Sequence, residues 1–192
     1  MDKLKIINYV SIAVIIVSLF FIGTGITGYA VSENVTGVVN VTITSAAALN
    51  FTTALLDFGA GAVVGGQTNA TLISNGTNTS WTGPGTTGEL VLENIGNVNV
   101  SLTLSTDINV TEHIGGESPS FKAKVTNSSG EEGACTTGNF TDYAEINQTL
   151  QIACANFAYD DAFDSIDIDF EVVIPSDASG AKTMGVVAIG TY

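Results

Sequence analysis

The sequence predicts an all-β protein built as a single β-sandwich domain, and three observations support this fold class. Apolar and polar residues alternate with a period of two in several short segments, which is typical of strands with one buried face. Gly, Asn and Ser cluster between these segments, where tight turns need them. After the first 30 residues, no segment has the 3.6-residue periodicity of a long amphipathic helix.

The first 30 residues differ from the rest and predict an N-terminal hydrophobic helix that precedes the sandwich. Lys3 and Lys5 stand before an apolar run from Tyr9 to Ile22. Four small residues come next: Gly23, Gly25, Gly28 and Ala30. A basic start, an apolar centre and a small-residue end are typical of a secretory signal. The run is also long enough, at roughly 18–20 residues, to cross a bilayer as a helix.

Two outcomes are therefore expected for residues 1–30. They are a signal peptide that is cut near Ala30, or an uncleaved anchor that crosses the membrane with residues 9–26. Both outcomes export residues 31–192, the predicted β-sandwich domain, across the cytoplasmic membrane. We expect this domain to act outside the cell or at its surface.

The charge balance narrows the possible partners. The chain has 19 acidic residues against 5 lysines and no arginine, which gives a formal net charge of −14. Such a protein is repelled by phosphate backbones, so we do not expect it to bind nucleic acid.

Strand patterns follow one another through the predicted domain. The first, Val35–Thr44, comes directly after the leader and alternates Val35, Val39, Val41 and Ile43 with polar or small residues. Further strands are expected at these segments: Leu49–Phe58, Thr68–Ile73, Phe121–Thr126, Asn147–Ala153, Ser165–Ile174 and Thr183–Tyr192. In Asn147–Ala153 the alternating apolar residues are Leu150 and Ile152.

The segment Glu89–Ser105 predicts an antiparallel hairpin. Leu90 and Leu92 alternate with polar neighbours before the turn sequence Asn94–Asn97, and four apolar residues alternate with polar ones after it. Gly96 and Asn97 tolerate the positive φ that a tight reversal requires. With this hairpin the total is about eight or nine strands, which favours a sandwich of immunoglobulin or jelly-roll type.

A long polar loop from Ser74 to Gly88 carries the only tryptophan, Trp81. An aromatic side chain in such a loop either anchors an interface or folds back on its own domain. The sequence leaves both possibilities open.

Eleven Asn-x-Ser/Thr triplets occur in the chain, which contains fifteen asparagines. The acceptor residues are Asn34, Asn40, Asn50, Asn69, Asn75, Asn78, Asn99, Asn109, Asn127, Asn139 and Asn147. An exported chain with so many acceptors is expected to be a surface glycoprotein. The alternative is that Asn and Thr only form the polar outer faces of strands.

Cys135 and Cys154 are the only cysteines. In an oxidising extracellular compartment they are expected to form a disulfide. Closing this loop would stabilise the fold by about 3 kcal/mol in the chain-entropy model.

The sequence does not predict an enzyme. His113 is the single histidine, and neither a Gly-x-Ser-x-Gly nor a His-Glu-x-x-His motif is present. Asp160, Asp161 and Asp164 stand close together and are weak candidates for calcium, although their spacing matches no EF-hand loop. No other cofactor is expected.

The order of the elements resembles exported β-sandwich subunits of the TasA/camelysin type and the archaeal bundling pilins related to them. Four features carry the resemblance: the strand directly after the leader, Ala54–Phe58, the turn Glu93–Asn97, and Ile174–Gly180 before the last strand. The resemblance implies a fibre of identical subunits, in which each subunit donates its N-terminal strand to the sheet of a neighbour. The protease activity ascribed to camelysins is not expected, because this chain lacks the histidines for a zinc site.

The segment Val35–Thr44 is therefore the predicted donor strand, and copies of the same chain are the predicted partners. The alternative is a glycosylated monomeric surface or adhesion domain that keeps its N-terminal anchor. A type IV pilin is disfavoured, because no Lys/Arg-Gly processing site precedes the apolar run.

Overall fold

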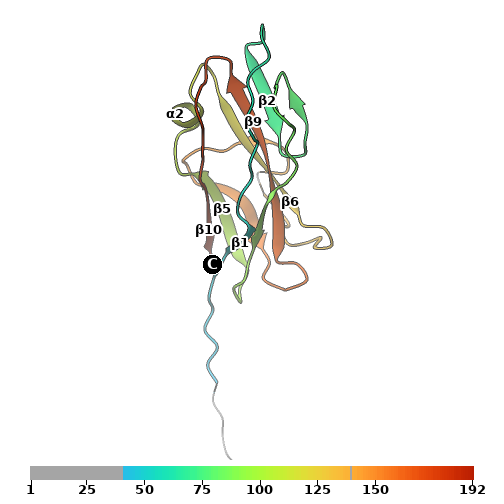
Figure 1. Ribbon diagram of the computed structural model, residues 1–192. Coiled ribbons are helices and arrows are strands. Elements are labelled where there is room, and N and C mark those ends of the chain that lie inside the picture. Colours follow the sequence, from blue (N-terminus) through green and yellow to red (C-terminus); the bar gives the residue numbers. More distant parts are fainter. Residues whose placement is uncertain (1–40, 139) are drawn as a thin grey trace, which may run out of the picture. The chain divides into compact units, whose positions relative to one another are not determined.

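The computed structural model describes residues 41–138 and 140–192, which form two antiparallel sheets and a short helix (Figure 1). The larger sheet contains β1 (Asn50–Thr53), β2 (Asn69–Ile73), β3 (Asn78–Thr79), β4 (Leu90–Glu93), β6 (Ser120–Asn127), β7 (Ala144–Glu145) and β9 (Ser165–Pro175). The smaller sheet contains β5 (Val100–Thr106), β8 (Gln151–Phe157) and β10 (Val186–Thr191). The helix α2 spans Val110–Ile114. The all-β prediction is therefore confirmed.

The predicted N-terminal helix and leader, residues 1–30, lie outside the described residues, as do Val35 and Val39 of the predicted donor strand. Within the described part of the chain, no helix is both long and apolar enough to span a membrane.

The strand β9 is the centre of the larger sheet. One of its edges pairs with β6 along eight residues, from Ser120↔Val173 to Asn127↔Ile166. Its other edge pairs first with β4 and then with β2, which follow one another along β9. The strands β1, β3 and β7 extend the sheet from β4, β2 and β6.

The alternation in β9 gives it one apolar and one acidic face, as the sequence predicts. Ile166, Ile168 and Phe170 point into the core and are at most 2% exposed. The acidic side chains between them face outward. Each has a partner on a neighbouring segment: Ser128 for Asp167, Ser74 for Asp169 and Lys122 for Glu171.

The smaller sheet has the order β10-β5-β8 and packs against the inner face of the larger one. The two sheets share one hydrophobic core. Its members from the larger sheet include Leu90, Leu92, Ile166, Ile168 and Phe170, and those from the smaller sheet include Val100, Leu102, Leu104, Ala153 and Phe157. This shared core holds the two sheets together.

The predicted hairpin Glu89–Ser105 is wrong, because β4 and β5 belong to different sheets. The turn between them is held by Asn94, whose buried amide donates to the carbonyl oxygens of Val98 and Phe157 at 3.0 and 3.2 Å. Gly96 is required there, since a Cβ would lie 2.5 Å from the carbonyl oxygen of Ala46. The turn therefore carries the chain from one sheet to the other.

The predicted apolar face of Asn147–Ala153 is also wrong. Leu150 and Ile152 are 52% and 45% exposed, whereas the adjacent residues Ala153 and Cys154 are both buried. The pairing of β5 with β8 shifts register on either side of Leu102. Such an irregularity breaks the period-two pattern, so the side chains that face the core cannot be read from alternation alone.

Two short elements lie where the sequence predicts loop or no structure. β3 lies within the predicted loop from Ser74 to Gly88, and α2 follows β5. The helix begins after Asn109, whose side-chain oxygen accepts from the main-chain N–H of Thr111. This is the usual role of an N-cap asparagine.

Candidate functional site

An apolar groove of about 1060 Å³ lies on the inner side of the larger sheet. Its floor consists of core side chains from four strands: Leu72 of β2, Leu90 of β4, Phe121 of β6, and Phe170 and Val172 of β9. Among the described residues the smaller sheet has three strands, and the groove lies where they leave part of the larger sheet uncovered by a strand.

Two irregular segments, residues 54–62 and 179–186, line the sides of the groove. Figure 1 shows both, in teal and dark red, running lengthwise with parts of β6 and β9 between them. Within the described structure, the main chain of residues 54–58 and of residues 179–184 forms no hydrogen bond. Most of these residues are exposed, so their main-chain groups are open to water and available as donors and acceptors to an incoming chain.

The second of these segments leads directly into β10. This strand pairs with β5 on one edge, and no described strand pairs with its other edge. A strand bound in the groove could therefore extend the smaller sheet beyond β10. An extended peptide that adds to a free sheet edge gains main-chain hydrogen bonds, and its alternate side chains fill apolar pockets.

The sequence predicts a strand across Leu49–Phe58, and only β1 forms within it. Strand alternation stops at Ala54, Leu55 and Leu56, three consecutive apolar residues that precede the glycines. Leu55 is 80% exposed, while Leu56 and Phe58 pack against the core. This break in the alternation is the sequence signal for the groove wall, and a search for strand periodicity misses it.

The groove carries little charge. Asp57, His113 and Lys182 are its only acidic or basic lining residues. The pKa of His113 is lowered from its usual value, mainly by burial and secondly by the charge of Lys182, although Asp107 acts in the opposite direction. His113 is therefore uncharged at neutral pH, and the groove suits an uncharged, apolar occupant.

The described end of the predicted donor strand is not a half-buried strand in the single chain. Val41 and Ile43 are 77% and 82% exposed, and residues 41–49 form no strand. Asn97 holds the following residues in place, because its side chain accepts from the N–H of Ala46 and donates to the carbonyl of Thr44. Val41 and Ile43 are therefore not buried in the single chain.

Trp81 lines the groove and folds back on its own domain. Its ring packs so closely on Gly61 and Gly83 that a Cβ on either glycine would overlap it. Its indole N–H is buried and has no hydrogen-bond partner within the described residues. The only tryptophan is thus a natural fluorescent reporter of this region.

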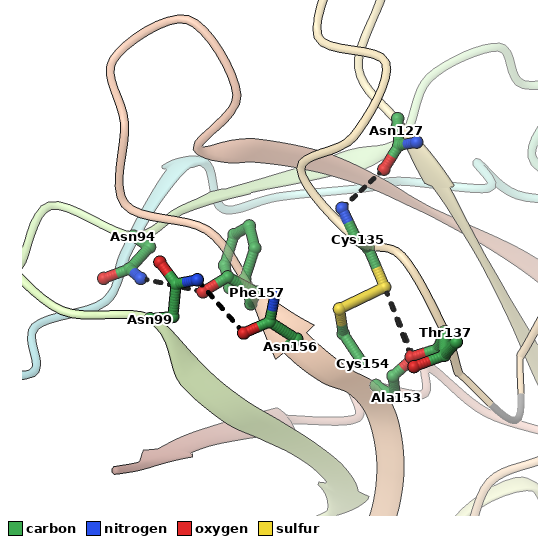
Figure 2. Close-up of a disulfide and its surroundings, with 9 residues drawn as sticks. All are labelled: Asn94, Asn99, Asn127, Cys135, Thr137, Ala153, Cys154, Asn156 and Phe157. Atoms are coloured by element: carbon green, nitrogen blue, oxygen red, sulfur yellow. Dashed lines mark hydrogen bonds between the residues drawn. A yellow bond between two sulfur atoms is a disulfide. The ribbon is translucent and has the colours of Figure 1, made fainter.

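The predicted disulfide is confirmed. Cys135 and Cys154 are joined, with their Cα atoms 5.6 Å apart. The bond connects the loop after β6 to β8 (Figure 2). Its presence is consistent with an oxidising compartment.

The structure describes eight of the eleven predicted glycosylation acceptors, and Asn34, Asn40 and Asn139 lie outside the described residues. Six are exposed: Asn50, Asn69, Asn75, Asn99, Asn109 and Asn147. Asn78 and Asn127 are half-buried. The side-chain oxygen of Asn127 accepts from the main-chain N–H of Cys135 at 2.7 Å (Figure 2), so this asparagine has a structural role.

The geometry gives no support to the predicted calcium site. Among the described residues, no three His, Cys, Asp or Glu side chains converge as metal ligands. Asp160 instead accepts a hydrogen bond from the N–H of Ala162. Burial raises the pKa of Asp164, and so do the nearby charges of Glu131, Glu93 and Asp161. These carboxylates repel one another around Asp164.

Comparisons with family models, with curated protein sequences and with solved structures found no match to this chain.

Proposed function

We propose that this chain is the structural subunit of an extracellular filament, pilus or matrix fibre. Each subunit donates its N-terminal strand, Val35–Thr44, to the groove of a neighbouring copy. In this proposal the domain is a β-sandwich of immunoglobulin or jelly-roll type that lacks one strand of its own. The groove, with unpaired main chain at residues 54–58 and 179–184 of its walls, is the observation that carries the proposal.

The chemistry of the predicted donor strand suits the groove. Val35–Thr44 contains no charged residue, and its apolar side chains Val35, Val39, Val41 and Ile43 can pack on the apolar floor of the groove without a desolvation penalty. The exposed Ile43 would bury its apolar surface, which contributes roughly 1.5–3 kcal/mol for a fully buried side chain. The unpaired main chain beside the groove would supply the hydrogen bonds.

The positions of donor and acceptor favour head-to-tail growth. Ser45 and Ala46 lie at the end of the domain where β10 finishes, since Tyr192 donates to the carbonyl of Ser45 and Asn97 binds Ala46. The groove extends towards α2, near the opposite end in Figure 1. A donor that leaves one end and an acceptor near the other make a heterologous contact, which generates an open, linear assembly when the rotation between subunits does not close a ring.

Three features support a location at the cell surface. The leader predicts export, the disulfide favours an oxidising compartment, and six described acceptor asparagines are exposed. An uncleaved leader would attach the subunit to the membrane through residues 9–26. A cleaved leader would give Val35–Thr44 a free end.

Strand donation can be tested with two chains, residues 31–192 and residues 43–192. We expect the longer chain to form filaments visible by electron microscopy, and the shorter chain to remain monomeric in sedimentation. If the longer chain also remains a stable monomer, strand donation is wrong. N-terminal sequencing of the native protein then tests the alternative, because a retained Met1 would support an anchored monomeric surface domain.

A peptide experiment tests the groove itself. A peptide of residues 33–46 should bind the 43–192 chain and change the fluorescence of Trp81. A matched peptide with V39S, V41S and I43S should not bind, since it keeps the main chain but loses the apolar side chains. Equal binding of both peptides would argue against insertion into the groove.

A further inference from the structure

The two outer edges of the smaller sheet are built differently. β10 forms one edge and has no described strand beyond it. β8 forms the other edge, and the loop of residues 134–138 lies along it. Cys135 makes an isolated antiparallel bridge with Phe157, and Figure 2 shows both residues beside the disulfide.

The loop uses the hydrogen-bonding groups that the β8 edge would otherwise present. The N–H of Ala155 donates to the carbonyl of Thr137 at 2.6 Å, and the N–H of Ala158 donates to the carbonyl of Ala134 at 2.9 Å. Gly138 approaches Ala153 so closely that a Cβ would overlap the carbonyl of Ala153. The loop therefore occupies the place of a partner strand.

The loop has no regular secondary structure of its own, and the disulfide is its one covalent attachment to β8. The hydrogen bond from the N–H of Cys135 to Asn127 holds the loop to β6. Without the disulfide, the loop would be kept on the edge by non-covalent contacts alone, namely these hydrogen bonds and the packing of the buried Ala134 in the core.

An uncovered β8 edge would be prone to pairing with other chains. The strand, Gln151–Phe157, contains no charged residue and no proline, and Ile152 is exposed on it. Neighbouring Leu150 is also exposed. Unpaired, uncharged edges with exposed apolar side chains are templates for edge-to-edge aggregation, which proteins prevent by covering them or adding charge.

We propose that the Cys135–Cys154 disulfide closes the β8 edge, so that strand addition takes place only at the β10 edge beside the groove. This inference rests on the proposed function. The disulfide thereby gives each subunit a single acceptor edge, and the fibre grows as an unbranched chain. The partner excluded at β8 is a strand of another copy of the same protein.

The test compares the full chain with its C135S/C154S variant and follows two readouts. The first is fibre shape in electron micrographs. We expect unbranched fibres from the unaltered chain, and branched or laterally fused aggregates from the variant. Thr137→Ala is the matched control, because it alters the same loop but keeps the disulfide and the main-chain hydrogen bonds. It should give unbranched fibres.

The second readout is hydrogen exchange at the N–H groups of Ala155 and Ala158, which does not depend on assembly. In the variant, we expect the exchange rates of these two N–H groups to increase by on the order of a hundredfold. This factor corresponds to the stabilisation that a cross-link provides when it closes a loop of this length. The N–H of Phe170, which donates to the buried Ser74, is the internal reference for global unfolding, and exchange at Ala155 and Ala158 should rise more than exchange at Phe170. If the variant does not fold, reduction of the folded unaltered chain provides the same comparison.

A rescue variant separates edge protection from general stability. Adding Ala155→Lys to C135S/C154S places a charge on the exposed side of β8 without restoring the disulfide. It should return the fibres to the unbranched form. Unbranched fibres from C135S/C154S, or unchanged exchange at Ala155 and Ala158, would overturn the inference. Absence of fibres from the unaltered chain would refute the proposed function instead, and the exchange measurement would still decide how the edge is closed.

Discussion

The side-chain amide of Asn94 donates a hydrogen bond of 3.2 Å to the main-chain carbonyl of Phe157. This contact joins the end of β4 in the larger sheet to the end of β8 in the smaller one. Asn94 is fully buried, and it also binds the carbonyl of Val98 and the N–H of Gly96. One side chain thus satisfies three main-chain groups at the crossing between the sheets.

Asn94→Ala should destabilise the domain by about 2–4 kcal/mol, because buried main-chain groups would lose their partners. Urea unfolding followed by Trp81 fluorescence measures this change. Asn156→Ala is the matched control, since it removes an exposed hydrogen bond with Asn99 and should cost less than about 1 kcal/mol. Equal effects of the two substitutions would contradict the structural role of Asn94.

The fold class was predictable because alternation in β6 and β9 is local and regular. The partner of a strand is a non-local property, and this explains the wrong hairpin. The pattern around Gly96 and Asn97 predicts a turn, and a turn is present. Only the three-dimensional structure shows that Asn94 and Ala46 direct the chain after that turn into the other sheet.

The groove was less predictable than the strands. Its walls are the segments where alternation fails, so a search for periodic patterns passes over them. The floor residues, such as Phe121 and Val172, have the same sequence pattern as other core residues. They line a groove because the described residues supply the smaller sheet with no fourth strand, which is a property of the whole topology.

The pKa of Asp164 leads to a prediction about pH. Burial is the main cause of its increase, followed by repulsion from Glu131, Glu93 and Asp161. A carboxyl group whose pKa is higher in the folded state binds its proton more tightly there. Its favourable contribution is therefore complete below the ordinary value of 3.8 and is lost as the pH rises through the raised pKa.

Asp164→Asn should consequently raise the melting temperature at pH 7, with a gain in stability of no more than about 1 kcal/mol for this partly exposed group. The gain should disappear at pH 3, where the aspartate is protonated. Thermal unfolding at both pH values measures the difference. Glu117→Gln removes an exposed charge elsewhere and should change little; a similar gain from it would indicate only a general effect of net charge.

Glycan occupancy should follow the environment of each acceptor. Asn109 and Asn147 are exposed, whereas the side chain of Asn127 is half-buried. Mass spectrometry of glycopeptides from the native protein should find glycans on Asn109 and Asn147 but not on Asn127. Thr111→Ala should abolish the glycan on Asn109, while Thr111→Ser should keep it. A glycan on Asn127 would contradict the effect of burial.

The contact of Gly61 with Trp81 can be tested with a single methyl group. Gly61→Ala would overlap the indole ring and should destabilise the domain by about 1–3 kcal/mol. The displaced ring should also shift the tryptophan emission. Gly65→Ala is the control, because nothing lies within 4 Å of its added Cβ. An unchanged emission spectrum in Gly61→Ala would mean that Trp81 packs elsewhere.

The walls of the groove come from opposite ends of the domain sequence, residues 54–62 and 179–186. The central strand β9 is also late in the chain and pairs with three strands that precede it. A nascent chain therefore cannot form the groove until residues 179–186 have been synthesised. Contacts between such distant parts of a sequence form late and slowly in folding. In the proposed fibre, an acceptor for another subunit would thus exist only after most of the domain has been made, which separates translation from polymerisation in time.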